Sequence, residues 1–152
     1  MTLSGKKAVV TGGGTGIGLA IAHRLAAEGC KVAITGRRLD VLEKASEAFG
    51  GLPIKMDVSQ EASVVGGMQA IADQFGNIDI CIANAGIAEG QNIRNSSFEF
   101  WRRVMSVNLD GAYLTIREAM RHMPVTEWGR VIAISSIAGI RGLNLSCSTP
   151  YS

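Results

Sequence analysis

A glycine-rich run near the amino terminus has the residue types and spacing needed to bind phosphate. Residues 8–11 read Ala-Val-Val-Thr, and they lead directly into the run 12–18, Gly-Gly-Gly-Thr-Gly-Ile-Gly. We expect a strand followed by a helix, whose first free N–H groups and dipole attract an anion. A side chain at Gly12, Gly16 or Gly18 would block the tight turn, the phosphate, or the packing of helix on strand. The run therefore predicts a site for the pyrophosphate of a dinucleotide. The alternative, a flexible loop, does not explain the apolar residues before it.

Two consecutive arginines follow the second apolar run. At this place, dinucleotide-binding folds select between nicotinamide cofactors. The sequence there reads Thr35-Gly36-Arg37-Arg38. NAD-specific folds usually place a carboxylate at the position of Gly36, and that charge would repel the extra phosphate of NADP. A guanidinium instead pairs with a phosphate through two hydrogen bonds. We therefore expect NADP as the cofactor. NAD is the alternative if Arg37 and Arg38 only form the solvated start of a helix.

Asn108 is a polar residue within a stretch whose apolar residues repeat with helical spacing. A long helix is predicted to start near Ser97, and its apolar stripe consists of Trp101, Met105, Leu109, Ala112, Ile116 and Met120. Counting along the helix places Asn108 on this stripe, which we expect to face inwards. A buried amide without hydrogen bonds costs about 1–3 kcal/mol. Packing alone is thus a poor explanation for Asn108, and we expect its side chain to face a functional site.

Apolar runs and helical patterns alternate from one end of the chain to the other. Nearly continuous apolar runs predict strands buried on both faces at residues 7–11, 31–35, 78–83 and 130–135, with a weaker strand at 53–58. Helical patterns lie between them, and residues typical of helix ends mark their limits: Gly29, Gly50, Ser59 as an N-cap, and Gly76. Right-handed crossovers turn this order into an α/β fold of the Rossmann type, a doubly wound parallel sheet with strand order 3-2-1-4-5.

The composition restricts the class of protein. The chain has 152 residues, of which 47% are hydrophobic and 18% charged, so one dinucleotide-binding domain with a sizeable core is expected over 1–152. The net charge of +2 is too small to predict nucleic acid or a membrane as a partner. The three cysteines have no paired spacing, and no metal site is predicted. The start lacks the apolar stretch of a signal peptide, and no segment is long enough to span a bilayer, so we expect a cytoplasmic protein.

Further motifs stand at the ends of the predicted strands. The glycine run reads T-G-x-x-x-G-x-G; Asp57-Val58 follows the third strand, Asn84-Ala85-Gly86 the fourth, and Ser135-Ser136 the fifth. Together with Asn108 in the long helix, this ordered set closely resembles the short-chain dehydrogenase/reductase family. The resemblance covers the whole chain, which corresponds to roughly the first three-fifths of a usual family member.

The resemblance implies a role for each cofactor motif. The residues implied in the cofactor turn are Thr11, Gly12, Gly14, Thr15, Gly16, Ile17 and Gly18. Asp57, beside Val58, would accept a hydrogen bond from the adenine amino group, and Asn84, Ala85 and Gly86 would shape the loop beneath the adenosine ribose. The alternatives are that Asp57 caps the next helix and that Asn84 is an ordinary turn residue. Thr15 departs from many NADP-using members, which carry a basic residue there.

The resemblance also implies that Asn108, Ser136 and Tyr151 belong to the catalytic Asn-Ser-Tyr-Lys set of the family. In that mechanism the tyrosine passes a proton to a carbonyl oxygen as hydride arrives, and a lysine four residues later lowers the phenol pKa from about 10. The serine would hold the substrate oxygen. The lysine would fall at position 155, after the last residue of the sequence. The interval from Ser136 to Tyr151 is longer than usual, so either residues 142–149 contain an insertion or Tyr151 is not the equivalent residue.

Three functional hypotheses follow. The first is an oxidoreductase that transfers hydride between NADP(H) and an alcohol or carbonyl substrate, of which this chain would be an incomplete and inactive portion, without the later strands and helices of the family. The second is a catalytically silent NADP(H)-binding or regulatory module. The third is an assembly partner, since family members often associate through the long helix. A homodimer or homotetramer is therefore expected through the helix around 98–122.

Overall fold

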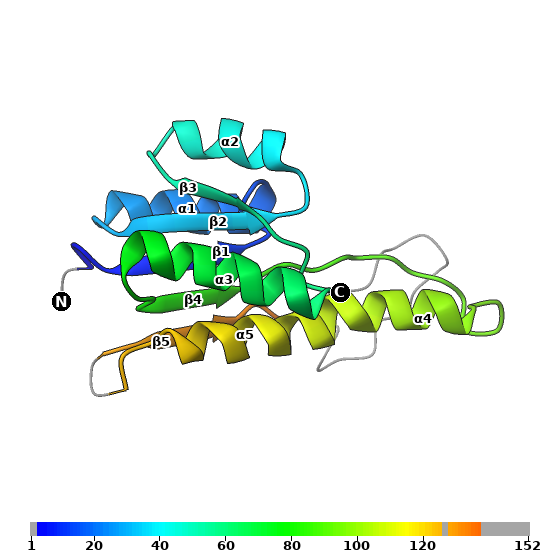
Figure 1. The fold of residues 1–152 in the computed structure, drawn as a ribbon. Coiled ribbons are helices and arrows are strands. Elements are labelled where there is room, and N and C mark those ends of the chain that lie inside the picture. Colours follow the sequence, from blue (N-terminus) through cyan, green and yellow to red (C-terminus); the bar gives the residue numbers. More distant parts are fainter. Residues whose placement is uncertain (1–2, 126–127, 138–152) are drawn as a thin grey trace.

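Five parallel strands form one sheet in the order β3-β2-β1-β4-β5. The structure is a computed structural model that describes residues 3–125 and 128–137. The strands are β1 (Lys7–Thr11), β2 (Lys31–Gly36), β3 (Leu52–Lys55), β4 (Ile80–Ala83) and β5 (Arg130–Ala133). Figure 1 shows the sheet with helices on both of its faces. The predicted doubly wound α/β fold and its strand order are therefore confirmed, and the weak strand β3 lies at one edge.

The helices alternate with the strands as predicted. They are α1 (Gly16–Ala27), α2 (Leu39–Glu47), α3 (Glu61–Phe75), α4 (Phe98–Met105) and α5 (Gly111–Arg121). A π-helical segment, η1 (Ser106–Asp110), joins α4 to α5, so that these three segments form one long rod (Figure 1). In the described part of the chain, no helix is long and apolar enough to cross a membrane.

Two apolar clusters cover the two faces of the sheet. Alternate residues of each strand point to opposite faces. Val9 and Cys81 pack with Met68 of α3 on one face, whereas Val10 and Ile34 pack beneath α1 and α2 on the other. Cys81 is fully buried, and this burial raises the pKa of its thiol to about 12. A thiol in that state is a small apolar core group rather than a nucleophile.

The predicted helix ends are right at two glycines and wrong at Ser59. Gly29 and Gly76 follow α1 and α3 with positive φ values of 87° and 86°, a conformation that glycine adopts at low cost. Ser59 is not the N-cap of α3, because that position is taken by Gln60. The N–H and hydroxyl groups of Ser59 instead donate hydrogen bonds to Oδ1 of Asp57, at 3.0 Å and 2.7 Å. Asp57 thereby holds Ser59 in the turn that precedes the helix.

The prediction that the apolar stripe of the long helix faces inwards is only partly right, because Met105, Ala112 and Ile116 are half-buried whereas the other members are exposed. Trp101, Leu109 and Met120 are 52%, 57% and 59% exposed. The buried face of α5 consists of Gly111, Thr115, Glu118 and Ala119. The small residues on the buried face allow α5 to approach the sheet closely.

A buried carboxylate on α5 belongs to an ion cluster with α3. Arg117 binds Glu118 at 2.7 Å and also Glu61, the first residue of α3, at 2.6 Å. Arg121 binds Glu118 from the next turn at 2.8 Å. Although burial by itself raises the pKa of Glu118, the hydrogen bonds from the two guanidinium groups lower it below its usual value. The cluster fixes the start of α3 against α5, immediately after the Asp57 turn.

The core predicts a large difference between two substitutions on α3. Met68 is fully buried, whereas Val65 is 40% exposed. Met68→Ala should lower the free energy of unfolding by about 2–5 kcal/mol because it leaves a cavity. Val65→Ala, the control on the same helix, should lower it by less than about 1 kcal/mol because little burial is lost. Urea unfolding followed by circular dichroism measures both, and equal losses would contradict the position assigned to α3.

Candidate cofactor site

The turn between β1 and α1 is a backbone arrangement that requires glycine. Gly12 and Gly16 have positive φ values of 65° and 55°. A Cβ atom at Gly18 would lie 2.4 Å from the carbonyl oxygen of Gly12 and 2.5 Å from Nδ2 of Asn84, well inside contact distance. The turn therefore passes under the start of α1 with no space for side chains. It leaves the first N–H groups of a twelve-residue helix directed out of the turn.

Gly13 is a further required glycine that the motif does not identify. A Cβ atom there would lie 2.6 Å from Cγ2 of Ile34, and its N–H donates to the carbonyl oxygen of Thr35 at 3.2 Å. This glycine thus seats the turn on β2. The only sequence signal for it is its place within three consecutive glycines.

The hydroxyl group of Thr11 joins the first turn to the loop after β4. Oγ1 accepts hydrogen bonds from the N–H groups of Asn84 and Ala85, both at 3.0 Å, and donates to the carbonyl oxygen of Ile82 at 3.4 Å. In return, Nδ2 of Asn84 donates to the carbonyl oxygens of Thr11 at 2.9 Å and Gly12 at 3.4 Å. Both side chains therefore act on backbone, and together they hold two loops at a defined separation.

A cavity of about 500 Å³ opens at the carboxyl ends of the strands. Its wall includes many of the residues predicted to bind a cofactor: Gly12, Gly14, Thr15, Arg37, Arg38, Asp57, Val58, Ala85 and Gly86. Other predicted residues stand behind this wall or beside it: Thr11, Gly16, Ile17, Gly18 and Asn84. Ile17 is 66% exposed on the first turn of α1. The four turns that follow β1, β2, β3 and β4 thus converge on one space.

Several cavity residues were missed by sequence reasoning. They are Thr35, Val41, Leu42, Met56, Ile87 and Val107. Most are apolar residues of the core, and no local pattern separates those at the cavity from those elsewhere in the core. Only Ile87 carries a signal, since it adjoins the Asn84-Ala85-Gly86 motif. Gly36, which the sequence places at the cofactor-selecting position, also lines the cavity.

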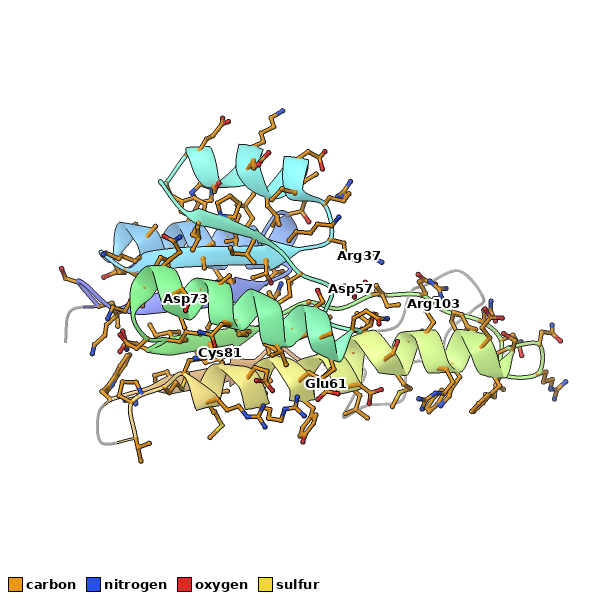
Figure 2. The ribbon with its side chains drawn as sticks, in the orientation of Figure 1. Arg37, Asp57, Glu61, Asp73, Cys81 and Arg103 are labelled. Carbon is orange, nitrogen blue, oxygen red and sulfur yellow. The ribbon has the colours of Figure 1, made fainter. Side chains whose placement is uncertain are left out.

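The two arginines lie exposed at the rim of this cavity, next to the end of β2. Figure 2 shows Arg37 at the same end of the sheet as Asp57. Arg38 is also the N-cap residue of α2, so the arginines do form the solvated start of a helix as well as part of the cavity wall. A Cβ atom at Gly36 would meet Leu42 at 3.5 Å, an ordinary contact. The glycine at this position is therefore not required by packing.

The turn at Asp57 combines a structural role with a place on the cavity wall. Besides accepting two hydrogen bonds from Ser59 at Oδ1, Asp57 donates its backbone N–H to Oγ of Ser63 at 3.0 Å. Val58 is buried and packs against α5, where a Cβ atom at Gly111 would lie 2.7 Å from it. Asp57 therefore does not cap α3 itself but holds the turn that precedes it, and it also lines the cavity.

Both polar atoms of the Asn108 side-chain amide form hydrogen bonds with the backbone of Ile87. Its Nδ2 donates to the carbonyl oxygen of Ile87 at 2.9 Å, and its Oδ1 accepts from the N–H of Ile87 at 2.8 Å. The side chain, which is half-buried, therefore satisfies its hydrogen bonds inside the protein. Its place within η1 is typical, because π-helical turns often occur at functional sites. Ser136 follows β5 at the same edge of the sheet, and Tyr151 lies outside the described residues.

These features fit a dinucleotide. The turn has no space for a side chain at Gly12, Gly13 or Gly18, and Gly12, Gly14 and Thr15 line the cavity next to the start of α1. The volume of the cavity lies within the usual range for small-molecule sites, about 300–1,000 Å³. In residues 3–125 and 128–137, no three His, Cys, Asp or Glu side chains cluster as a metal site would require. The cavity is therefore of a size and lining that suit phosphate groups and an adenosine.

The glycine turn predicts a sharp contrast between two alanine substitutions. Gly18→Ala should destabilise the protein by about 1–3 kcal/mol, because the new methyl group collides with the backbone of Gly12. Gly66→Ala on α3 adds the same group in open space and should instead stabilise the protein, by up to about 1 kcal/mol. Urea unfolding of both variants measures the difference. A Gly18→Ala protein as stable as the original would contradict the close approach.

Comparisons with known proteins agree with this geometry. A family model described as short chain dehydrogenase matches residues 6–152. The chain is 41% identical over 145 residues to an NADP-dependent (R)-specific alcohol dehydrogenase of Lentilactobacillus kefiri, covering 92% of this chain and 58% of that protein. It is 36% identical over 146 residues to a 3-oxoacyl-(acyl-carrier-protein) reductase of Aquifex aeolicus, covering 92% and 59%.

Solved structures show the same likeness. A short-chain type dehydrogenase/reductase from Mycobacterium marinum superposes with a TM-score of 0.89 at 34% identity, covering 94% of this chain and 60% of that one. A short chain dehydrogenase from Burkholderia cenocepacia, crystallised with NADP, gives a TM-score of 0.84 at 32% identity, covering 95% and 60%. The chain spans about three-fifths of the length of these relatives. The protein therefore belongs to the short-chain dehydrogenase/reductase family of oxidoreductases.

Proposed function

We propose that this chain binds NADP(H) and forms the cofactor-binding part of an oxidoreductase acting on an alcohol or carbonyl substrate. The observation that carries the proposal is the convergence of the glycine turn, Gly36, Arg37 and Arg38 on one cavity. The turn suits the pyrophosphate, and the arginines supply positive charge where the extra phosphate of NADP would lie. The NADP named for the Lentilactobacillus and Burkholderia relatives supports the same choice. NAD remains the alternative cofactor.

The residues of the chain divide the proposed binding between them. The N–H groups at the start of α1 would bind the pyrophosphate, and Arg37 and Arg38 would pair with the 2′-phosphate. Asp57 would accept the hydrogen bond of the adenine amino group, with Val58 and Ala85 forming apolar walls. When bound, the nicotinamide supplies or accepts a hydride.

The proposed catalytic residues rest on the resemblance to the family. Ser136, at the carboxyl end of β5, would donate a hydrogen bond to the substrate oxygen. Tyr151 would exchange the proton, by analogy with the family. For Asn108 we propose a positioning role, because both polar atoms of its side-chain amide are bonded to the backbone of Ile87.

The exposed apolar stripe supports a proposal about assembly. Trp101, Leu109 and Met120 place large apolar side chains on the outer side of the long helix. Burying such residues against a second copy is favourable, at about 25 cal/mol per Å². We therefore propose a homodimer or homotetramer formed through residues 98–122. A cytoplasmic location is proposed with it, supported by the free thiols of Cys30 and Cys81 in the described core.

The first test is direct binding of the cofactor to the folded protein. Titration calorimetry with NADPH should give saturable binding at one site, and NADH should bind more weakly because it lacks the phosphate that the arginines attract. Absence of binding by either cofactor at millimolar concentration would contradict the proposal. Binding of NADPH without turnover is expected if this chain is an incomplete portion of the enzyme, and clear turnover of an alcohol or carbonyl compound by the chain alone would contradict that expectation.

A single substitution should reverse the cofactor preference. Gly36→Asp fits sterically, and its carboxylate would repel the 2′-phosphate while accepting hydrogen bonds from the ribose hydroxyls of NADH. We expect the ratio of the NADPH to the NADH dissociation constant to rise by about tenfold or more. Gly66→Asp on α3 introduces the same charge away from the cavity and is the control. Fluorescence titration with both reduced cofactors measures the ratio, and an unchanged ratio would refute the assignment of Gly36 and Arg37.

A further inference from the structure

The connection between β4 and α4 forms one wall of the cavity without being part of a helix or strand. It runs from Asn84 to Ser97 and brings Ala85, Gly86 and Ile87 to the cavity. A connection of this length loses considerable conformational entropy when it is held in one shape. Its position must therefore be maintained by specific contacts with its surroundings.

Two side chains of the long helix hold this connection. Asn108 bonds both backbone groups of Ile87, as described above. Arg103 binds Glu89 in a two-pronged ion pair, in which Nη1 donates to Oε1 at 2.7 Å and Nη2 donates to Oε2. Figure 2 shows Arg103 rising from α4. The hydrogen bonds to Glu89 raise the pKa of the guanidinium, which therefore stays charged. Asn108 and Arg103 thus bind the connection at Ile87 and Glu89, which are two residues apart.

We propose that Arg103 and Glu89 are a positioning pair that keeps the Ala85–Ile87 wall in place for the cofactor. Neither side chain is among the residues that line the cavity, so the pair acts through the loop. By clamping Glu89, the pair confines the neighbouring Ile87 within reach of Asn108. The consequence for cofactor binding rests on the function proposed above, whereas the consequence for loop order does not.

The size of the expected effect follows from the exposure of the pair. The side chains of Arg103 and Glu89 are 54% and 38% exposed, so water and salt screen their attraction. Two-pronged geometry makes this pair stronger than a single contact. We therefore expect changes of roughly two- to five-fold on its removal, and we expect them to diminish at high ionic strength.

The first measurement needs no ligand. Hydrogen–deuterium exchange followed by mass spectrometry reports on the N–H of Ile87, which is protected by Asn108. Glu89→Gln and Arg103→Gln should each accelerate exchange in the peptide containing Ile87 by roughly two- to five-fold. The double variant Glu89→Arg with Arg103→Glu should restore slow exchange. The control is Arg24→Gln, which removes an exposed ion pair of 2.6 Å with Glu28 on α1 and should leave exchange at Ile87 unchanged.

The second measurement connects loop order to the cavity. The dissociation constant for NADPH should rise roughly two- to five-fold in Glu89→Gln and Arg103→Gln, and it should recover in the double variant. Unchanged exchange at Ile87 would overturn the inference, and so would faster exchange with an unchanged dissociation constant. If the original protein does not bind NADPH at all, the proposed function fails, and the exchange data alone then decide whether the pair positions the loop.

Discussion

The contact between Gly18 and Gly12 is the constraint on which the rest of the site depends. Because α1 starts so close to the end of β1, the backbone itself forms the floor of the cavity, and a single methyl group would separate the two. The same closeness brings the amide of Asn84 against the turn. Gly12, Gly14 and Thr15 of this turn thus line the cavity immediately before the start of α1.

Polar side chains around the cavity serve mainly to position backbone. Thr11, Asn84 and Asn108 each bond main-chain groups of a neighbouring loop, and Asp57 bonds Ser59 in its own turn. These hydrogen bonds hold neighbouring backbone segments in place around the cavity. In the function proposed here, recognition of a charged ligand falls to the N–H groups at the start of α1 and to the arginines after β2. The Arg103–Glu89 pair likewise positions backbone, because it holds the connection after β4 from outside the cavity.

The two sides of the long helix carry different types of residue. Its buried side has small residues such as Gly111 and Ala119, which permit close packing on the sheet and on the Asp57 turn. Its outer side carries Trp101, Leu109 and Met120, which suit contact with another surface. Asn108 lies in the π-helical segment that joins α4 to α5, and its side chain is bonded to Ile87. One helix thereby anchors the cavity wall and leaves large apolar side chains exposed on its outer side.

The sequence by itself determined the fold and the places where loops meet the cavity. Continuous apolar runs and the T-G-x-x-x-G-x-G turn are local patterns, and each reflects backbone geometry that nearby residues impose. Only the tertiary structure decided the rest. The exposure of Trp101, Leu109 and Met120 depended on what packs against the long helix, and the role of Asn108 depended on a loop twenty-one residues earlier in the chain. Such contacts join segments distant in sequence, and no local pattern of residue types encodes them.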